Sequence, residues 1–319
     1  MTVETSPPAA AGVRTTGGLA SSKMSPSADR TIRILNHLAG HPDQSFTFSQ
    51  LRRDLGMSSG TLHALLASLV KASYARRHPD TLTYSLGPAV LALGAAARSG
   101  YRLADDLVPE MERLSRELAL TCHATVAQSG EMVVIARTGP VEPFGRRVRV
   151  GERYPLMPPF GTAYVAWSDP GSIDAYLARS DPPLSADDRR RCRHALDSVR
   201  ARGYAVSLNP STRHRVGELI DGSDNWSGQE LGALLSELAH EEYVLADVAA
   251  GSSYDVVAMT APVFGPDGSV LGLLALANFP RPLSAEAIPG LAARLRQATV
   301  IPGAGAAAAG SGSPWPTAV

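Results

Sequence analysis

Hydroxyl, imidazole and basic side chains gather between residues 58 and 78. Hydroxyl and imidazole groups form hydrogen bonds with base edges and phosphate oxygens, and Lys and Arg neutralise phosphates. This combination predicts contacts with a nucleic acid. The candidate contact residues are Ser58, Ser59, Gly60, Thr61, His63, Ala64, Lys71, Arg76, Arg77 and His78.

The distribution of charge favours a nucleic-acid partner for the first part of the chain alone. Over 319 residues, 30 Lys and Arg balance 30 Asp and Glu. Residues 27–88 carry seven basic and four acidic side chains, a net charge of +3, whereas residues 89–319 carry 21 and 25, a net charge of −4. A small positive module is therefore joined to a larger, mildly acidic one.

Three helices are expected to position the contact residues. The first covers residues 28–39, with a cap at Ser27 and an apolar face of Ile32, Leu35 and Ala39. The second follows a capping box formed by Thr47 and Gln50 and stops at Gly56. The third covers residues 60–71, and its apolar stripe consists of Leu62, Leu65, Leu66, Leu69 and Val70.

The turn around Gly56 gives the last two helices the spacing of a helix-turn-helix, in which the second helix can enter a major groove. Residues 74–77 and 81–86 then read as a hairpin with a turn at His78-Pro79-Asp80, which would form a basic wing. The outer face of the third helix holds almost no Arg, Asn or Gln, the usual readers of bases. A module that contacts only protein therefore stays an open alternative.

The order of these elements, followed by Leu86-Gly87-Pro88 and Leu93-Gly94, resembles the IclR family of bacterial transcriptional regulators. The resemblance runs from about residue 27 to residue 297. It implies a winged helix-turn-helix, a linker helix and a C-terminal GAF-like α/β domain that binds an effector, an α+β fold overall.

Landmarks of the effector domain follow the linker. They are a helix face of Leu107, Met111, Leu114 and Leu118, a strand pair at 121–137, a helix from Ser185 to Gly203 with a strand at 204–207, and a hairpin at 256–279. Residues 208–253 form an insertion relative to the family. We expect a helix at 228–241 and a strand at 243–250 within it.

The resemblance also implies where an effector would bind. Family members that sense small carboxylates place polar groups at positions that fall here on Ser207, Ala258, Ala275 and Ala277, and three of these are methyl groups. Met157, Pro159 and Phe160 add apolar surface nearby. A buried carboxylate would lack partners there. The substitutions predict a larger, more apolar effector, with a collapsed core that binds nothing as the alternative.

Catalysis and metal binding find little support in the sequence. The Gly-x-Ser-x-Gly spacing of hydrolases occurs at Gly56–Gly60, but between two expected helices rather than after a strand. The His-x-x-x-His spacing of His37 and His41 and the Glu-x-x-His spacing of Glu237 and His240 lie in separate segments of the chain. Cys122 and His123 are adjacent, and neighbours on a strand point to opposite faces. The run Arg189-Arg190-Arg191 with Arg193 spreads around a helix, which is typical of a solvated face. We expect no enzyme activity, no cofactor and no metal.

These observations lead to one overall expectation. The chain is predicted to be a cytoplasmic transcriptional regulator that binds an operator in double-stranded DNA as a homodimer or dimer of dimers, with a small-molecule effector and no membrane contact. The alternative is a ligand-sensing or protein-interaction module with weak or no DNA binding. The expected segments are a disordered tail at 1–26, a winged helix-turn-helix at 27–87, a linker helix at 88–102, an effector domain at 103–299 and a disordered tail at 300–319.

Overall fold

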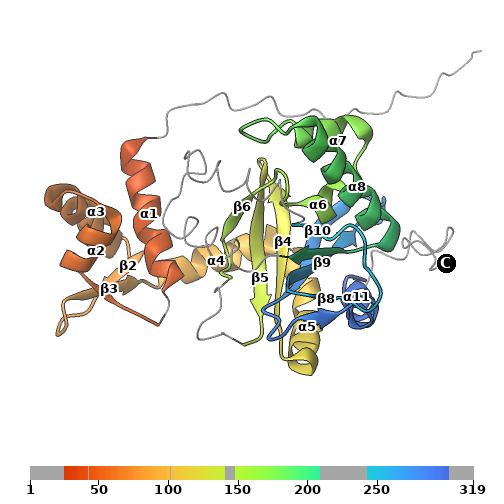
Figure 1. Ribbon diagram of the computed structural model, residues 1–319. Helices are drawn as coiled ribbons and strands as arrows, with labels where there is room; N and C mark the ends of the chain where they lie inside the picture. The colour runs from red at the N-terminus through yellow and green to blue at the C-terminus, as the bar shows by residue number, and fades with distance from the viewer. Residues whose placement is uncertain (1–24, 42, 101, 141–147, 209–242, 302–319) are drawn as a thin grey trace, which may run out of the picture. The chain divides into compact units, whose positions relative to one another are not determined.

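The computed structural model describes residues 25–41, 43–100, 102–140, 148–208 and 243–301 (Figure 1). The chain divides into two compact units, one ending at Leu91 and one beginning at Ala92. Helix α4 (Ala89–Gly100) crosses this division. Among the described residues, no helix combines the length and the apolar character that a membrane crossing requires.

The first unit is a winged helix-turn-helix. Its elements are α1 (Pro26–Gly40), β1 (Phe46–Thr47), α2 (Phe48–Leu55), α3 (Ser59–Lys71), β2 (Ala75–Arg77) and β3 (Thr83–Leu86). The three strands form one small antiparallel sheet in the order β1-β3-β2. The centre of the core is fully buried and consists of Ile34, Leu51, Leu62 and Leu66.

Helix α1 differs from its prediction in two respects. Its N-cap is Ser25 rather than Ser27, because Pro26 occupies the first turn, where the missing N–H of proline costs nothing. Its buried face contains Ile34 and Leu38, while Ile32 is 49% exposed. The predicted face was therefore wrong.

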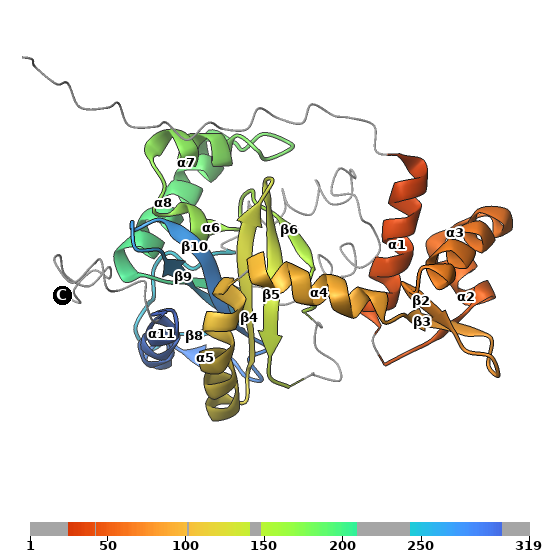
Figure 2. The same ribbon diagram turned by 180° about the vertical axis from the view of Figure 1, so that it is seen from behind.

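The second unit is built on a six-stranded antiparallel sheet in the order β6-β5-β4-β10-β9-β7 (Figures 1 and 2). These strands are β4 (Thr121–Gln128), β5 (Glu131–Thr138), β6 (Arg153–Pro155), β7 (Ala205–Leu208), β9 (Val256–Phe264) and β10 (Val270–Ala277). A separate pair joins β8 (Ser253–Tyr254) to β11 (Leu283–Ser284). The predicted strand pair at 121–137 and hairpin at 256–279 are both confirmed.

Helices cover both faces of this sheet. On one face lie α5 (Arg102–Leu118) and α11 (Ala287–Ala298), and on the other lies α6 (Thr162–Val165), with α7 (Pro170–Leu177) and α8 (Ala186–Arg202) packed against it. The central strand β10 is buried over most of its length, as expected for a strand covered on both sides. Two apolar cores result, one beneath each helical layer.

Helix α8 confirms its predicted limits, with Ser185 as N-cap and Gly203, in the left-handed conformation, as C-cap. The strand predicted at 243–250 was wrong: only an isolated bridge joins Val244 to Ser207, and the following residues form no strand. The predicted helix at 228–241 lies outside the described residues. Most of the two predicted tails, 1–26 and 300–319, also lies outside them.

Candidate functional site

Helix α3 buries its leucines and exposes the opposite face. Leu62, Leu66 and Leu69 are buried in the core of the first unit. Ser58 caps the helix, because its Oγ accepts a hydrogen bond from the backbone N–H of Thr61 and donates one to the Thr61 hydroxyl. The polar first turn is therefore fixed at the surface by the packing of the apolar stripe.

The exposed face of α3 is short of long polar side chains. It consists of Ser59, Gly60, His63, Ala64, Ala67, Ser68 and Lys71. None of these is Arg, Asn or Gln, the residues that most often make paired hydrogen bonds to guanine or adenine. Lys71 lies at the opposite end of the helix from Ser59, so it reaches a different part of any bound duplex.

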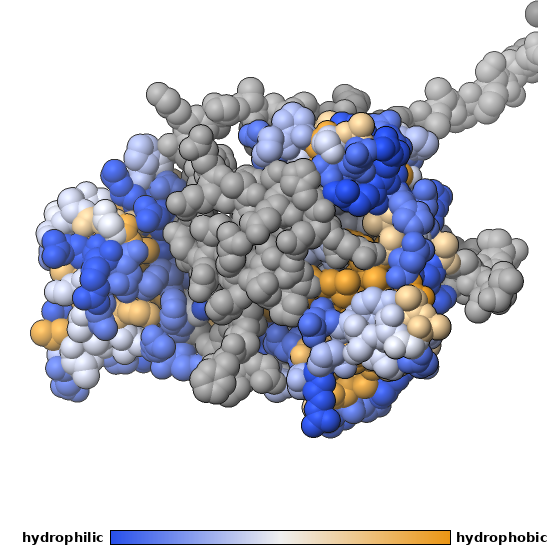
Figure 3. Space-filling model, viewed as in Figure 1, coloured by the Kyte–Doolittle hydropathy of each residue, from blue (hydrophilic) through white to orange (hydrophobic). Residues whose placement is uncertain are grey.

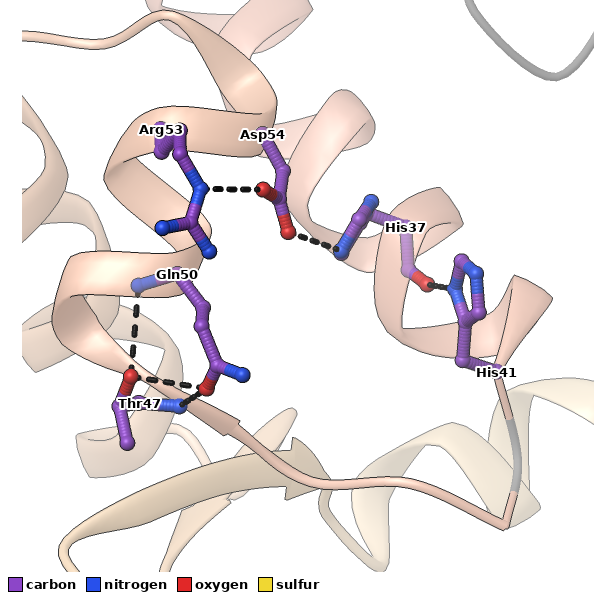
Figure 4. Close-up of polar contacts among 6 residues, drawn as sticks. All are labelled: His37, His41, Thr47, Gln50, Arg53 and Asp54. Carbon is purple, nitrogen blue, oxygen red and sulfur yellow. Dashed lines mark hydrogen bonds and ion pairs between the residues drawn. The ribbon is translucent and has the colours of Figure 1, made fainter.

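Helix α2 is held in place at both ends, as Figure 4 shows. At its start, the Thr47 hydroxyl accepts from the Gln50 backbone N–H and the Gln50 side chain accepts from the Thr47 N–H, which confirms the predicted capping box. At its end, the Asp54 carboxylate lies 3.7 Å from Nε2 of His37 on α1. Gly56, in the left-handed conformation, then lets the chain turn into α3.

The basic residues of the wing lie on two faces of the hairpin. Arg76 pairs with Ser85 across the strands, and a hydrogen bond of 3.4 Å joins its guanidinium to Nε2 of His78. Arg77 pairs with Tyr84 instead, and its guanidinium carbon lies 5.9 Å from the centre of that ring. The structure therefore brings Arg76 and His78 together and places Arg77 on the other side.

Two exposed basic residues near the turn were missed by the sequence analysis. Arg52 and Arg53 occupy the last turn of α2, directly before the turn that leads into the first turn of α3. The signal for them was their position at the end of the first helix of the motif, which crosses the DNA backbone in proteins of this architecture. Figure 3 shows that the surface of this unit is mainly hydrophilic with scattered apolar spots.

A cavity of about 110 Å³ lies between the sheet of the second unit and the segment around α6. Its floor is formed by side chains of β4, β7, β9 and β10: His123, Thr125, Ala205, Ser207, Ala258, Thr260, Leu273 and Ala275. His123 stands directly across from Ala275, and Ala275 from Thr260, so these three form one row across the sheet.

The roof of the cavity is formed mainly by residues 159–163, with Met132, Tyr154, Tyr243 and Val244 at its sides. The hydroxyl of Tyr176 donates a hydrogen bond of 2.8 Å to the backbone carbonyl of Phe160. The hydroxyl of Thr162 donates one of 2.8 Å to the backbone carbonyl of Pro159. Burial raises the pKa of Tyr176, which keeps its hydroxyl a neutral donor. These bonds hold the backbone at Pro159 and Phe160, two residues that line the cavity.

Five of the seven residues predicted for effector contact line this cavity, namely Pro159, Phe160, Ser207, Ala258 and Ala275. Met157 and Ala277 do not, and Ala277 is fully buried. The polar residues His123, Thr125 and Thr260 were missed. Their alternation along the strands signalled a shared face, but the partner strands could not be aligned from the sequence.

The candidates for catalysis are separated by the fold. Cys122 is buried among the residues packed under α5 and α11, whereas His123 faces the cavity. Among the described residues, no group of three His, Cys, Asp or Glu side chains could hold a metal ion. Three of the arginines of α8 form ion pairs: Arg190 with Asp187, Arg191 with Asp188, and Arg193 with Asp174. They therefore belong to the hydrophilic surface over α7 and α8 (Figure 3).

Comparisons with known proteins match both units. The profile of the IclR helix-turn-helix domain matches residues 27–79, and that of the bacterial transcriptional regulator IclR C-terminal domain matches residues 96–214. The Pca regulon regulatory protein of Pseudomonas putida is 29% identical over 59% of this chain, a match that spans 66% of that protein.

Solved structures show the same fold. An IclR transcriptional regulator from Alicyclobacillus acidocaldarius aligns with a TM-score of 0.56 at 20% identity, covering 86% of this chain and 96% of that one. An IclR homologue from Microbacterium hydrocarbonoxydans, solved in complex with 4-hydroxybenzoate, aligns with a TM-score of 0.56 at 18% identity, covering 86% and 95%. The sequence and structural similarities thus extend over both units.

Proposed function

The chain belongs to the IclR family of bacterial transcriptional regulators, and from this premise we propose that it binds an operator through α3 and the wing and responds to a small effector held in the cavity. The observation that carries the proposal is the exposed first turn of α3, whose orientation is set by the buried leucines behind it. An exposed, rigidly held helix of a winged helix-turn-helix is the part that enters a major groove.

The effector half of the proposal rests on the cavity of about 110 Å³. A largely preformed pocket with a few convergent polar groups is the usual form of a small-molecule site. The Microbacterium hydrocarbonoxydans homologue, which was solved with 4-hydroxybenzoate, supports ligand binding in this family. Effector binding would alter operator affinity through coupled equilibria, and the coupling must be reciprocal.

Titration of a duplex tests the DNA-binding half. A short duplex site is first selected from random sequences by the full chain, and its affinity is then measured at several salt concentrations. Arg76→Ala should weaken binding and reduce the slope of log affinity against log salt by about 0.9 for each phosphate that is no longer neutralised. Arg200→Ala, which removes an exposed charge of α8 in the second unit, is the matched control and should change neither.

The two faces of the wing allow a finer comparison. Arg77→Ala removes the same charge as Arg76→Ala from the side of the hairpin that packs on Tyr84. If the face of Arg76 and His78 contacts phosphate, the Arg76 variant loses more affinity than the Arg77 variant. Recovery of no duplex from the selection, or equal affinity of all variants for the selected site, would contradict operator binding through this surface.

A second candidate function is a ligand sensor that acts through protein contacts. It is favoured by the exposed face of α3, which holds no Arg, Asn or Gln. The duplex selection distinguishes the two functions, because a sensor without DNA binding enriches no sequence. Enrichment of one sequence with weak affinity for single sites would instead agree with recognition of paired half-sites.

We further propose that a second copy of the chain covers α4. Leu91 is 77% exposed and Leu93 is 53% exposed on this helix. One small module buries too little surface for a specific site, so two modules are needed. Light scattering should show that Leu91→Glu with Leu93→Glu lowers the mass in solution, whereas Arg200→Glu leaves it unchanged. An unchanged mass for the double variant would contradict this interface.

A further inference from the structure

The floor of the cavity alternates between hydrogen-bonding groups and methyl groups. Along one row of the sheet, His123 on β4 stands beside Ala275 on β10, which stands beside Thr260 on β9, which stands beside Ala205 on β7. All four line the cavity. The methyl group of Ala275 therefore leaves room between an imidazole and a hydroxyl. A ligand hydroxyl placed there lies between the imidazole of His123 and the hydroxyl of Thr260, both of which line the cavity.

The sides and roof supply aromatic surface. The ring centres of Phe160 and Tyr154 lie 6.2 Å apart, and those of Phe160 and Tyr243 lie 5.6 Å apart at 72°. All three rings line the cavity. Aromatic pairs prefer such tilted arrangements at these separations. A flat ring that enters the cavity would therefore meet ring edges and faces on this side, while Met132 and Leu273 add aliphatic contacts.

The described residues that line the cavity carry no permanent charge. Of the residues that the structure describes around the cavity, none is Lys, Arg, Asp or Glu. An ionised carboxylate placed in such a site gives up its hydration without gaining a fixed counter-charge, which is costly. The charge of the lining therefore favours neutral ligands over acids.

The volume of the cavity is close to that needed by one ring. A closed apolar cavity of about 150 Å³ is known to hold benzene, and this cavity has about 110 Å³. Because hydroxyl and imidazole groups line one side, a ring that carries a hydroxyl is a better match than an unsubstituted ring.

We infer that the cavity selects a neutral, one-ring hydroxylated aromatic compound, with its ring against Phe160 and its hydroxyl between His123 and Thr260; this rests on the proposed function of the cavity as the effector site. The hydroxyl donates to one of these two groups and accepts from the other. Carboxylates of the same size are disfavoured because they are charged at neutral pH.

Direct titration of the full chain tests this class. Phenol and benzyl alcohol are compared with benzoate and phthalate by calorimetry at about pH 7.5, where the first two are neutral and the others carry one and two negative charges. We expect the neutral compounds to bind about tenfold more tightly than benzoate, and phthalate not to bind. Benzoate binding as tightly as phenol, or binding by none of the four compounds, overturns the inference.

Two variants locate the binding. Thr260→Val keeps the shape of the side chain and removes its hydroxyl, so phenol should lose about fivefold in affinity while toluene is unaffected. Ala258→Leu places three more carbon atoms in the cavity and should abolish binding of phenol, whereas Ala201→Leu on the exposed face of α8 should not. Thermal unfolding of each variant confirms that it is folded.

The ligand class and the proposed function fail in different ways. If phenol does not bind but the selected duplex is still bound, and is released by some other compound, only the ligand class is wrong. If phenol binds as expected but no duplex is ever enriched, the ligand class stands and operator binding fails. Equal loss of phenol affinity in Ala258→Leu and Ala201→Leu would place the ligand elsewhere and overturn the inference.

Discussion

Cys122 and His123 are consecutive residues of β4 whose side chains enter opposite layers of the second unit. The thiol is fully buried under α5 and α11, while the imidazole lines the cavity on the other face of the sheet. Successive side chains of a strand point to opposite faces of the sheet, so two consecutive residues cannot enter the same layer. One residue thus serves packing and its neighbour serves the candidate ligand site, and the two cannot form a nucleophile–base pair.

Burial raises the pKa of the Cys122 thiol to about 12. In the unfolded chain the pKa of a thiol is about 8.5. Between the unfolded-state and native-state pKa values, the unfolded state therefore binds fewer protons than the native state. The free energy of unfolding is therefore unaffected by this group below about pH 8.5 and falls as pH rises toward about 12. The loss is at most about 1.4 kcal/mol per pH unit. Urea titrations between about pH 8 and pH 10 measure this slope.

The matched variant for this prediction is Cys122→Ala. It lacks the titrating group, so its stability should fall less steeply with pH, although the lost sulfur lowers its stability at every pH. All other groups that titrate at alkaline pH are present in both proteins, so their contributions to the pH dependence of stability cancel in the comparison. Parallel slopes for wild type and variant would show that the thiol does not stay protonated in the fold.

Gly87 has no room for a side chain. A Cβ atom there would lie 2.2 Å from the carbonyl oxygen of Ser73, and the Gly87 N–H donates to the carbonyl of Tyr74 at 2.8 Å. Gly87→Ala should therefore destabilise the first unit by about 1–3 kcal/mol. Amide hydrogen exchange, which reports the first unit separately from the second, measures the effect.

Gly60→Ala is the control for this substitution. Gly60 lies in the first turn of α3, and no atom outside its own helix backbone lies within 4 Å of the position that a Cβ would take. Alanine in a helix is more favourable than glycine by about 0.5–1 kcal/mol. This variant should therefore be slightly more stable, and the amides of the first unit should exchange more slowly. Equal protection in both variants would contradict the close packing at Gly87.

The capping box at the start of α2 should contribute measurably to stability. Thr47→Ala removes the side-chain oxygen that accepts from the Gln50 N–H, which costs about 0.5–2 kcal/mol. Ser49→Ala deletes an exposed hydroxyl from the same helix and should change stability by less than about 0.5 kcal/mol. The stability of both variants is measured from the denaturant dependence of amide hydrogen exchange in α2. A Thr47 variant as stable as the Ser49 variant would show that the cap is not formed.

Tyr176→Phe tests how the roof of the cavity is held. The variant loses the hydrogen bond to the Phe160 carbonyl while keeping the ring, and should lower stability by about 0.5–1.5 kcal/mol. Because Phe160 is then less firmly placed, phenol affinity should fall as well. Tyr164→Phe, which deletes a phenolic hydroxyl in α6, should leave phenol affinity unchanged; a loss in both variants, or in neither, would contradict this role of Tyr176.

Local patterns in the sequence were sufficient for the first unit. The capping box of Thr47 and Gln50, the glycine at 56 and the leucine stripe of α3 each depend on residues a few positions apart, so short-range spacing predicted them correctly. The predicted face of α1 was wrong because packing against α2 and β3 determines that Ile34 and Leu38 are buried. Ile32 offers a similar apolar side chain, and helical spacing alone could not rank the two.

The cavity was only partly predictable for a different physical reason. The alternation of each strand showed that Ser207, Ala258 and Ala275 could share a face, and the structure places them together. Which strands stand side by side, and in which register, depends on hydrogen bonds between segments far apart in the sequence. That register alone sets His123 beside Ala275 and Ala275 beside Thr260. The amino-acid sequence thus determined a basic winged helix-turn-helix and an α/β partner, while the tertiary pairing of strands decided which polar groups line the cavity.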